Sequence, residues 1–521
     1  MQGQGIFRYI DLAVLVLALL GTVVIGFILS RKNKDSDSFF MARESMPGWA
    51  VGLSLMATII SSMTFLASPA YSYKADWRWM ATCIAYPLAL IPAIKWFMPF
   101  FRTSEARSAY DYFEQRFGPW ARVYVAFGFV LTQGFRSGII LDATAIGLDA
   151  LVGIPYLLTI IGMGSAVVVY CALGGLKAVI WTDVIQGVGL IAGAALVIPI
   201  VCYYLPGGAG QLIRDSISEN KISLGPMTSS LQDLTFWTIL ISHIVLYTQW
   251  FCTDQMFVQR YCSPRTMRDA RWTLNLSMLT TVPVWTYFIM VGTAVWAFYR
   301  QFPDSVVAAA TAEEAFPRFV ANNFPVGLSG LFATGMCLAA MPSSSINAAA
   351  ATIETDFYRR FLVKRAPESH YLIAGRVFSV VFGIIVIGIA FVVHSVRTTT
   401  LIELQAVMMG IFGSGLLGLF LLGFATRVSN QSAAIATLLT IGLVAGWLTL
   451  AQSEDAKTWM PHDLWLGVVA NVFLFIMGLC WELGRRATRS GIHETAPSIL
   501  RSDTDTRPGV DLAAISDTTP T

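Results

Sequence analysis

The sequence predicts an all-α protein of the polytopic membrane class. Hydrophobic residues make up 55% of its 521 residues and charged residues only 13%, whereas soluble domains carry about 25% charged residues. The apolar residues fall into runs of about 20, which is the length that an α-helix needs to cross a bilayer. These runs indicate about thirteen transmembrane helices.

The predicted spans follow one another with short loops between them. In order, they cover about 10–30, 49–73, 78–101, 120–148, 154–174, 178–204, 233–256, 272–299, 326–352, 371–394, 400–425, 431–451 and 463–483. The first run has no basic segment or cleavage site before it, so we expect a retained helix rather than a signal peptide. No loop is long and apolar enough to form a separate soluble domain.

Lysine and arginine residues are unevenly divided between the loops of the two sides. If the N-terminus is outside, the inner segments hold 24 of these residues and the outer segments nine. Because positively charged loops remain in the cytoplasm, we expect a protein of the plasma (inner) membrane with its N-terminus outside and its C-terminus in the cytoplasm. The polar segment 485–521 is typical of a disordered tail.

Sequence patterns that carry enzymatic chemistry are missing. The segment Gly413-Ser-Gly-Leu-Leu-Gly418 matches a dinucleotide-binding loop, but it lies inside a predicted span with no strand before it. Close helix packing through small residues explains it better. The seven cysteines are scattered without metal-ligand spacing, which favours free buried thiols. We therefore expect a protein that is not an enzyme.

The span at 49–73 contains polar residues and a proline at membrane depth. Before Pro69 it carries the hydroxyl residues Thr58, Ser61, Ser62, Thr64 and Ser68. An interrupted helix in a membrane is tolerated only where it is buried in protein or lines a cavity, and such helices form the substrate and ion sites of many secondary transporters. The alternative is a continuous helix whose hydroxyls bond their own backbone.

Two charged residues lie inside other predicted spans. A central arginine costs at least about 2.5–3.5 kcal/mol to insert, so Arg136 should face a partner or a cavity. It could hold a substrate carboxylate or pair with Asp142, although those two residues lie on different faces of one helix. Asp183 could coordinate a cation, relay a proton or form an ion pair at the inner gate.

Two further clusters of polar residues are candidates for binding an ion or a substrate. In Pro342-Ser-Ser-Ser-Ile-Asn347, Ser343 and Ser344 offer the oxygen ligands that hard cations prefer, so they could bind a monovalent ion with carbonyls near Ala57 and Ile60. They could equally bond back to the preceding turn. In the second cluster, which ends the span at 233–256, Asp254 and Gln255 could contact a polar substrate or stabilise the cytoplasmic vestibule.

Together these clusters resemble the sodium/solute symporter family, which includes sodium-coupled transporters of sugars, proline, iodide, vitamins and sialic acid. The matching segments occur in the family's order over about residues 10–425. They are 57–65, 108–118, 174–186, Val258-Gln-Arg-Tyr261, Ser343-Ser-Ser-Ile-Asn347 and Asp356-Phe-Tyr-Arg359.

The resemblance implies a leucine-transporter-like (LeuT-like) core of two inverted five-helix (5+5) repeats, in which the first helix of each repeat is broken. The expected units are an N-terminal extra helix with a cytoplasmic loop (1–48), the first repeat (49–204), an extracytoplasmic loop (205–232), the second repeat (233–425), two accessory helices (426–484) and the tail (485–521).

The resemblance also implies where sodium binds. Ala57 and Ile60 match positions whose backbone carbonyls bind the main sodium ion. Asp183, with Ser343 and Ser344, matches a second sodium position that is found in some members. Sodium ion is therefore the expected cofactor.

For the substrate, the resemblance is nearest to the sialic acid branch. Arg136 matches an arginine that grips the substrate carboxylate in that branch, and Ser61 and Thr64 match hydroxyls that contact the sugar acid. Trp79 lies at an aromatic contact position, whereas Cys83 replaces a glutamine contact. The candidate substrate-binding residues are Thr58, Ser61, Ser62, Thr64, Trp79, Cys83, Arg136, Asp254 and Gln255.

One difference from the family affects the main sodium site. Members have a pair of hydroxyl residues before the serine run, but here Ala339-Ala-Met341 leads directly into Pro342. The chain is about two residues short, and two residues turn a helix by about 200°. The geometry of the site must therefore differ from the family's: either Ser343 takes the vacant role, or the main sodium site is weak or absent.

We predict a secondary active transporter that carries a small polar organic solute (a sugar, a sugar acid such as sialic acid, or another carboxylate) with sodium by alternating access. One alternative uses protons on the same fold, with Asp183 as the relay. A transporter-like sensor is disfavoured because no signalling domain follows Arg489. The expected partners are the solute, sodium and the lipid bilayer, with no nucleic acid, and the chain is expected to act as a monomer.

Overall fold

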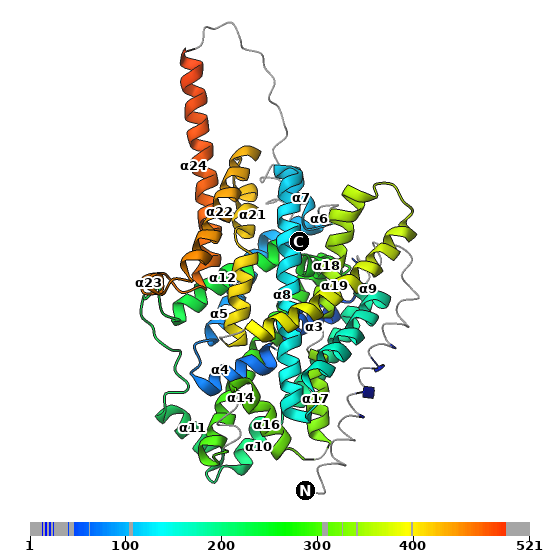
Figure 1. Cartoon of the computed structure of the whole chain (residues 1–521), viewed down its shortest axis with the longest axis vertical. Helices are drawn as coiled ribbons and strands as arrows, with labels where there is room; N and C mark the ends of the chain where they lie inside the picture. Colours follow the sequence, from blue (N-terminus) through cyan, green and yellow to red (C-terminus); the bar gives the residue numbers. More distant parts are fainter. Residues whose placement is uncertain are drawn as a thin grey trace.

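The chain forms an elongated bundle of helices (Figure 1). The computed structural model describes residues 13, 16–17, 20–21, 24, 40, 46–61, 63–103, 108–304, 311–325, 327–339, 342–396 and 400–495. Within these ranges the only extended pairing is an isolated bridge between Met46 and Pro264. The all-α prediction is therefore confirmed.

The helices follow the predicted spans from residue 49 onward. The part that corresponds to the predicted first repeat and the loop after it contains α3 (Gly48–Ile59), the π-helical turn η1 (Met63–Ala67), α4 (Ser68–Lys74), α5 (Met80–Pro92), η2 (Ala93–Phe97), α6 (Met98–Thr103), α7 (Asp111–Phe117), α8 (Pro119–Val152), α9 (Tyr156–Ala194), α10 (Val197–Tyr204) and α11 (Gly208–Ser218).

The remaining helices cover the predicted second repeat and the accessory segment. They are α12 (Phe236–Thr253), α13 (Gln255–Cys262), α14 (Met267–Gln301), α16 (Ala312–Asn323), α17 (Leu328–Ala339), α18 (Ser343–Thr352), η3 (Ile353–Leu362), α19 (Glu368–Val396), α20 (Leu401–Phe412), α21 (Leu416–Ala425), α22 (Asn430–Leu450), α23 (Glu454–Lys457) and α24 (Trp465–Thr495).

Several of these helices can cross a membrane. Seven helices in the described ranges are long and apolar enough, and two bent helix pairs raise the number to nine. This supports a multi-pass membrane protein, whereas the number of thirteen spans and the division into units remain predictions. The predicted span at 10–30 lies largely outside the described residues, as does the tail beyond residue 495.

The first helix of the predicted first repeat is broken where its polar residues begin. α3 ends at Ile59, and Ile60 takes an extended conformation with φ −83° and ψ 106°. The segment that starts at Met63 leaves α3 at an angle of 56°. Pro69 lies in the first turn of α4, where its missing N–H costs no hydrogen bond. The predicted break is therefore confirmed.

The first helix of the predicted second repeat is broken in a related way. α12 ends at Thr253, and Asp254 has φ −92° and ψ 116°. Its carboxylate accepts a hydrogen bond from the backbone N–H of Met256 at 2.8 Å, so it caps the N-terminus of α13. Asp254 thus ends one helix and starts the next.

α14 holds both halves of the first broken helix. Gly292 packs so closely on α4 that a Cβ atom there would lie 2.1 Å from the Pro69 carbonyl oxygen. The Ser72 hydroxyl donates to the Ile289 carbonyl oxygen at 2.8 Å. On α3, the Thr273 hydroxyl donates to the Gly48 carbonyl oxygen at 2.9 Å. The break therefore lies against a continuous helix.

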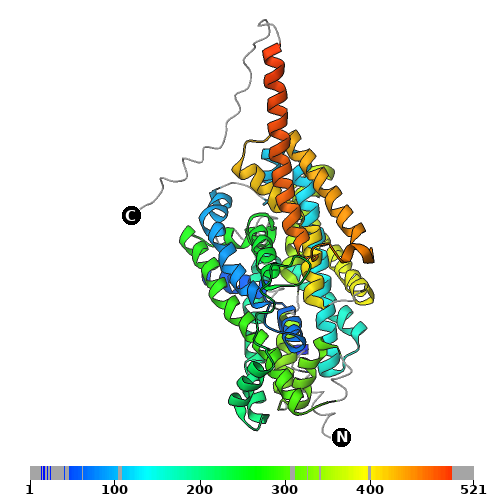
Figure 2. The same cartoon turned by 90° about the vertical axis from the view of Figure 1, so that its left-hand side faces the viewer.

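The two ends of the bundle differ in the loops that they carry. α24 projects from one end, and α10 and α11 lie at the other (Figures 1 and 2). α16 also lies at the end opposite α24. α11 and α16, which belong to loops that were expected on the outer side, thus lie at the same end of the bundle.

Candidate substrate and ion site

A cavity of about 90 Å³ lies beside the break in the first helix. Its polar lining includes Ser61, Thr64, Thr82, Arg136, His243 and Gln405, and the rest of the lining is mainly aromatic and apolar. The polar and apolar lining residues together come from six separate segments of the chain. An apolar cavity with a few convergent polar groups is typical of a site for a small molecule.

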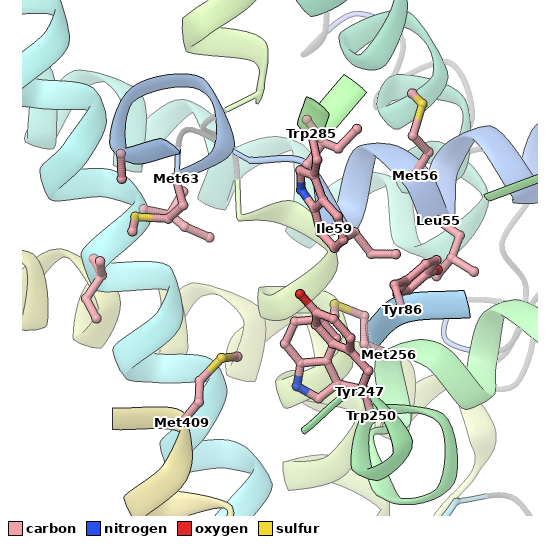
Figure 3. Close-up of a cluster of buried hydrophobic side chains, with 14 of the residues drawn as sticks. Leu55, Met56, Ile59, Met63, Tyr86, Tyr247, Trp250, Met256, Trp285 and Met409 are labelled. Carbon is pink, nitrogen blue, oxygen red and sulfur yellow. The ribbon is translucent and has the colours of Figure 1, made fainter. Parts of the chain in front are cut away.

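Aromatic rings from α12 and α14 form one wall of the cavity. The rings of Tyr247 and Trp285 stack with their centroids 5.9 Å apart, and Tyr247 contacts Trp250 at 5.0 Å. Figure 3 shows these three rings together, with Met63 and Met409 across the view from them. Rings that pack on one another hold a rigid surface against which a ligand can lie.

Among the described residues, Arg136 is the only lysine or arginine that lines this cavity. Its side chain, on α8, is 3% exposed. One guanidinium nitrogen, Nη2, donates to the carbonyl oxygen of Thr58 at 2.8 Å, and the guanidinium lies 5.4 Å from the centre of the Trp250 ring. Its Nε is buried without a hydrogen-bond partner. The guanidinium thus caps the end of α3 and keeps a donor for a ligand.

The alternative pairing of Arg136 with Asp142 does not occur. Asp142 instead accepts hydrogen bonds from the Tyr156 hydroxyl at 2.8 Å and pairs with His394 at 2.9 Å. Within the described ranges, no carboxylate lies within 4.0 Å of the Arg136 guanidinium. Among the described residues, Arg136 is therefore a buried cation without a direct ion-pair partner, and Asp254 acts on it only through space.

α8 connects the two helix breaks through two side chains one turn apart. Arg136 reaches the end of α3, while the Gln133 amide donates to the Asp254 carboxylate at 2.8 Å. The same amide group accepts from the Ser345 hydroxyl at 2.8 Å, which brings α18 into the network. Gln133 was not among the predicted site residues.

The other predicted substrate residues divide into two groups. Ser61, Thr64 and Trp79 line the cavity, and the Thr64 hydroxyl accepts from the Trp285 indole N–H at 3.1 Å. The side chains that do not line it are those of Thr58, Cys83, Asp254 and Gln255. Ser62 lies outside the described residues.

The polar residues that do not line the cavity have partners inside the protein. The Gln255 side-chain oxygen accepts from the backbone N–H of Ala109 at 2.8 Å, and Asp254 is held by Gln133. This arrangement resembles the vestibule-stabilising alternative more than a direct contact with substrate. Their role in substrate binding remains a prediction.

His243 and Gln405 line the cavity although neither was among the predicted site residues. Both are polar residues inside predicted spans, and this was the signal that could have identified them. The His243 ring nitrogen Nδ1 lies 2.9 Å from the Ile239 carbonyl oxygen, so it bonds to the preceding turn of its own helix.

Asp183 lies in a second buried polar cluster, which the four helices α3, α9, α13 and α18 form. The Ser54 hydroxyl donates to its Oδ2 at 2.7 Å, the Ser344 hydroxyl donates to the same oxygen at 3.2 Å, and the Ser343 hydroxyl donates to Oδ1 at 3.3 Å. The structure therefore brings together the three residues that were predicted to bind a second sodium ion. Their oxygen donors suit a hard monovalent cation.

Arg260 forms an ion pair with Asp183 in this cluster. Its Nη2 lies 2.9 Å from the Asp183 carboxylate, and the two side chains are 0% and 4% exposed. The guanidinium also donates to the Ser344 hydroxyl and to the Ser54 hydroxyl at 3.2 Å. From the sequence, Arg260 was expected to be a positive charge of an inner loop, but in the structure its side chain is completely buried.

At the main sodium position, the described residues include the helix end that would supply the carbonyls. They do not include the whole segment in which the family has its hydroxyl pair. The chain leaves the helix after Ile59, so the last carbonyls of α3 lose the N–H partners that a continuing helix would give them. Ala57 and Ile60 lie in this last segment. Ala340 and Met341, where the family's hydroxyl pair is missing, lie outside the described residues.

These features define a class of protein. Two helices broken at mid-bundle, a small cavity between them and charged groups at the breaks are the architecture of secondary transporters. The site contains no arrangement of the described residues that would bind a metal through several histidine, cysteine or acidic side chains.

The comparisons with known proteins identify the family. The family model described as "Sodium:solute symporter family" matches residues 39–441. The chain is 30% identical to the sodium/sialic acid symporter NanT of Aliivibrio fischeri, over 92% of this chain and 93% of that protein. It is 28% identical to the sodium-coupled monocarboxylate transporter 1 of Xenopus laevis, over 90% of this chain and 73% of that protein.

A solved structure agrees with this assignment. A Na⁺-coupled sialic acid symporter in a substrate-bound outward-open state superposes with a TM-score of 0.80 at 27% identity, covering 91% of this chain and 97% of the other. The chain therefore belongs to the sodium:solute symporter family, so it is a sodium-coupled transporter with the LeuT-like fold and not an enzyme.

Proposed function

We propose that the protein imports a small organic carboxylate together with sodium, and that a sugar acid such as sialic acid is the first candidate. Arg136 carries this proposal, because it is a buried guanidinium at the wall of the cavity with an unpartnered Nε. Among the described residues, no carboxylate forms a direct ion pair with it, and Asp254 acts on it only through space. A buried cation without a partner is unfavourable, and a substrate carboxylate would neutralise it through charge-assisted hydrogen bonds.

The rest of the cavity fits such a substrate. The hydroxyls of Ser61 and Thr64 and the amide of Gln405 can bond to the hydroxyls or amide of a sugar acid, and Trp79 offers an apolar face. The names of two relatives, a sialic acid symporter and a monocarboxylate transporter, describe substrates that share a carboxylate. Within the proposal, the carboxylate is therefore the common feature of the substrate.

For sodium, we propose two positions. The carbonyls of Ala57 and Ile60 would hold the main ion at the C-terminal end of α3, where the helix dipole is negative. Asp183, with Ser343 and Ser344, would hold a second ion. The ions would favour the state that binds substrate, because a ligand shifts an equilibrium only through its different affinities for the two states.

We further propose that the protein acts as a monomer in the inner membrane, with its N-terminus outside. The excess of Lys and Arg in the segments assigned to the inner side supports this orientation. The position of the loop helices α11 and α16 at the end opposite α24 also supports it.

Uptake into proteoliposomes tests the proposal. Sialic acid, lactate, glucose and proline would be offered under an inward sodium gradient, an inward proton gradient or neither. The expected result is uptake of at least one of the carboxylates under the sodium gradient and no uptake of glucose. Uptake of a carboxylate under the proton gradient alone would favour the proton-coupled alternative, and uptake of glucose but neither carboxylate would contradict the assigned role of Arg136.

A further inference from the structure

The predicted second sodium position contains a cation that belongs to the protein itself. We propose that Arg260 is a tethered counter-ion, which neutralises Asp183 while sodium is absent and which sodium must displace. This inference rests on the proposed sodium-coupled function and adds a role for a residue outside the predicted site. The evidence for it is that Arg260 contacts oxygen atoms to which a sodium ion at this position would also bind.

Arg260 contacts two of the three residues of the predicted second sodium position, Asp183 and Ser344. The guanidinium contacts the Asp183 Oδ2 atom at 2.9 Å, the Ser54 hydroxyl at 3.2 Å and the Ser344 hydroxyl. A guanidinium has only donors, so each of these oxygens points its lone pairs at Arg260. A sodium ion coordinated by Asp183 and Ser344 would lie beside the guanidinium, and two cations at such close range repel each other strongly. The two cations therefore compete for this position.

Burial explains why the position needs a cation in both states. The Asp183 side chain is 4% exposed, and a buried carboxylate without a counter-ion is strongly unfavourable. A symporter must return through its cycle without sodium, and during this step Asp183 would be unpaired. Arg260 supplies the missing charge during the return, and sodium replaces it during the loaded step.

The position of Arg260 in the fold connects this exchange of cations to the two broken helices. Arg260 lies on α13, the short helix that follows the break at Asp254, and its partner Ser54 lies on α3, which precedes the other break. Through Asp183 and Ser344 it also contacts α9 and α18. The two half-helices are thus joined through one side chain, and sodium binding would release this connection.

Sodium titration of the purified protein tests the inference directly. The probe is sodium chloride alone, with choline chloride keeping the ionic strength constant, and the readout is the thermal unfolding temperature. Arg260→Gln should lower the half-saturating sodium concentration about tenfold, because it removes a buried competitor. Arg260→Lys keeps a charge with fewer hydrogen bonds and should lower it less, by about threefold. Arg122→Gln, which removes a different buried arginine that pairs with Asp356 at 2.5 Å, should leave it unchanged.

Transport gives a second readout that a purely structural role would not change. In Arg260→Gln proteoliposomes, net uptake should fall at least about tenfold, because the empty carrier must return with an unpaired carboxylate. Exchange of labelled for unlabelled substrate, with sodium on both sides, should stay within about twofold of wild type, since the empty carrier does not return during exchange.

Three results would overturn the inference. They are an unchanged sodium affinity in Arg260→Gln, an unchanged affinity in Arg260→Lys if the glutamine variant does not fold, and an equal loss of exchange and net uptake in the glutamine variant. If wild-type protein shows sodium-driven uptake while any of these holds, the inference fails and the proposed function stands. If sodium changes neither the unfolding temperature nor the uptake of wild-type protein, both the inference and the proposed function fail.

Discussion

Replacing Arg136 with glutamine should remove the preference for an acid over its uncharged ester. The guanidinium is 3% exposed and no carboxylate of the described residues lies within 4.0 Å of it, so its pair with a substrate would be desolvated. Breaking such a pair costs about 2–5 kcal/mol. At 1.4 kcal/mol for each factor of ten, wild-type protein should prefer the acid about 30-fold to several thousand-fold.

The same substitution should change the stability of the empty protein little. Arg136 gives the protein a charged hydrogen bond to the Thr58 carbonyl oxygen at 2.8 Å, which contributes about 1.5–3 kcal/mol. Its burial without an ion-pair partner costs several kcal/mol, and the two effects oppose each other. We therefore expect an unfolding temperature near that of wild type, unlike the large loss that follows removal of one member of a buried ion pair.

The assay measures binding of sialic acid and of its methyl ester to wild type, Arg136→Gln and Arg136→Lys at saturating sodium. The glutamine variant should bind acid and ester about equally, and the lysine variant should recover part of the preference, since an ammonium is a point charge without the planar fork of guanidinium. Ester binding should be similar in all three proteins. Equal weakening of acid and ester in the glutamine variant would refute the reasoning, because it would show that Arg136 only shapes the cavity.

Three further predictions follow from other contacts. Asp183→Asn should raise the half-saturating sodium concentration at least about tenfold in uptake assays, because it removes the carboxylate of Asp183 from the second ion position. An unchanged value would exclude Asp183 from ion binding. Gly292→Ala should lower the free energy of unfolding by about 1–3 kcal/mol, since its Cβ atom would lie 2.1 Å from the Pro69 carbonyl oxygen. The control Gly388→Ala should not, because nothing lies within 4 Å of a Cβ atom there. Thermal unfolding of both variants tests this prediction. Replacing sodium with choline should lower the unfolding temperature of wild type, because a ligand that binds only the folded state stabilises it; an equal temperature in both salts would contradict sodium binding.

The broken first helix could be predicted because its signal is local. Hydroxyl residues and Pro69 interrupt an apolar run, and a chain that must satisfy its backbone in a membrane can tolerate them in few places. Arg136 could be predicted for a similar reason, since a charge at mid-span is expensive wherever it lies. The structure places both at the same cavity.

The role of Arg260 could not be predicted in this way. It follows an apolar span by only a few residues, as the positive charges of cytoplasmic loops do. Its burial depends on contacts with α3, α9 and α18, and its partners Ser54 and Asp183 are 206 and 77 residues away in the chain. Asp254 and Gln255 show the converse, because their polarity suggested a ligand while Gln133 and the Ala109 backbone satisfy them from distant helices.

The position of Arg136 also gives a physical reason for the coupling of sodium to a carboxylate. The guanidinium donates to the Thr58 carbonyl oxygen, at the same helix end where Ala57 and Ile60 are proposed to bind sodium. Two cations at one helix end repel each other. We infer that a carboxylate which draws Arg136 into the cavity makes the helix end more favourable for sodium. Because such coupling is reciprocal, sodium at the helix end favours the carboxylate by the same factor, and Arg136→Gln should reduce this factor for the acid and leave the ester unaffected.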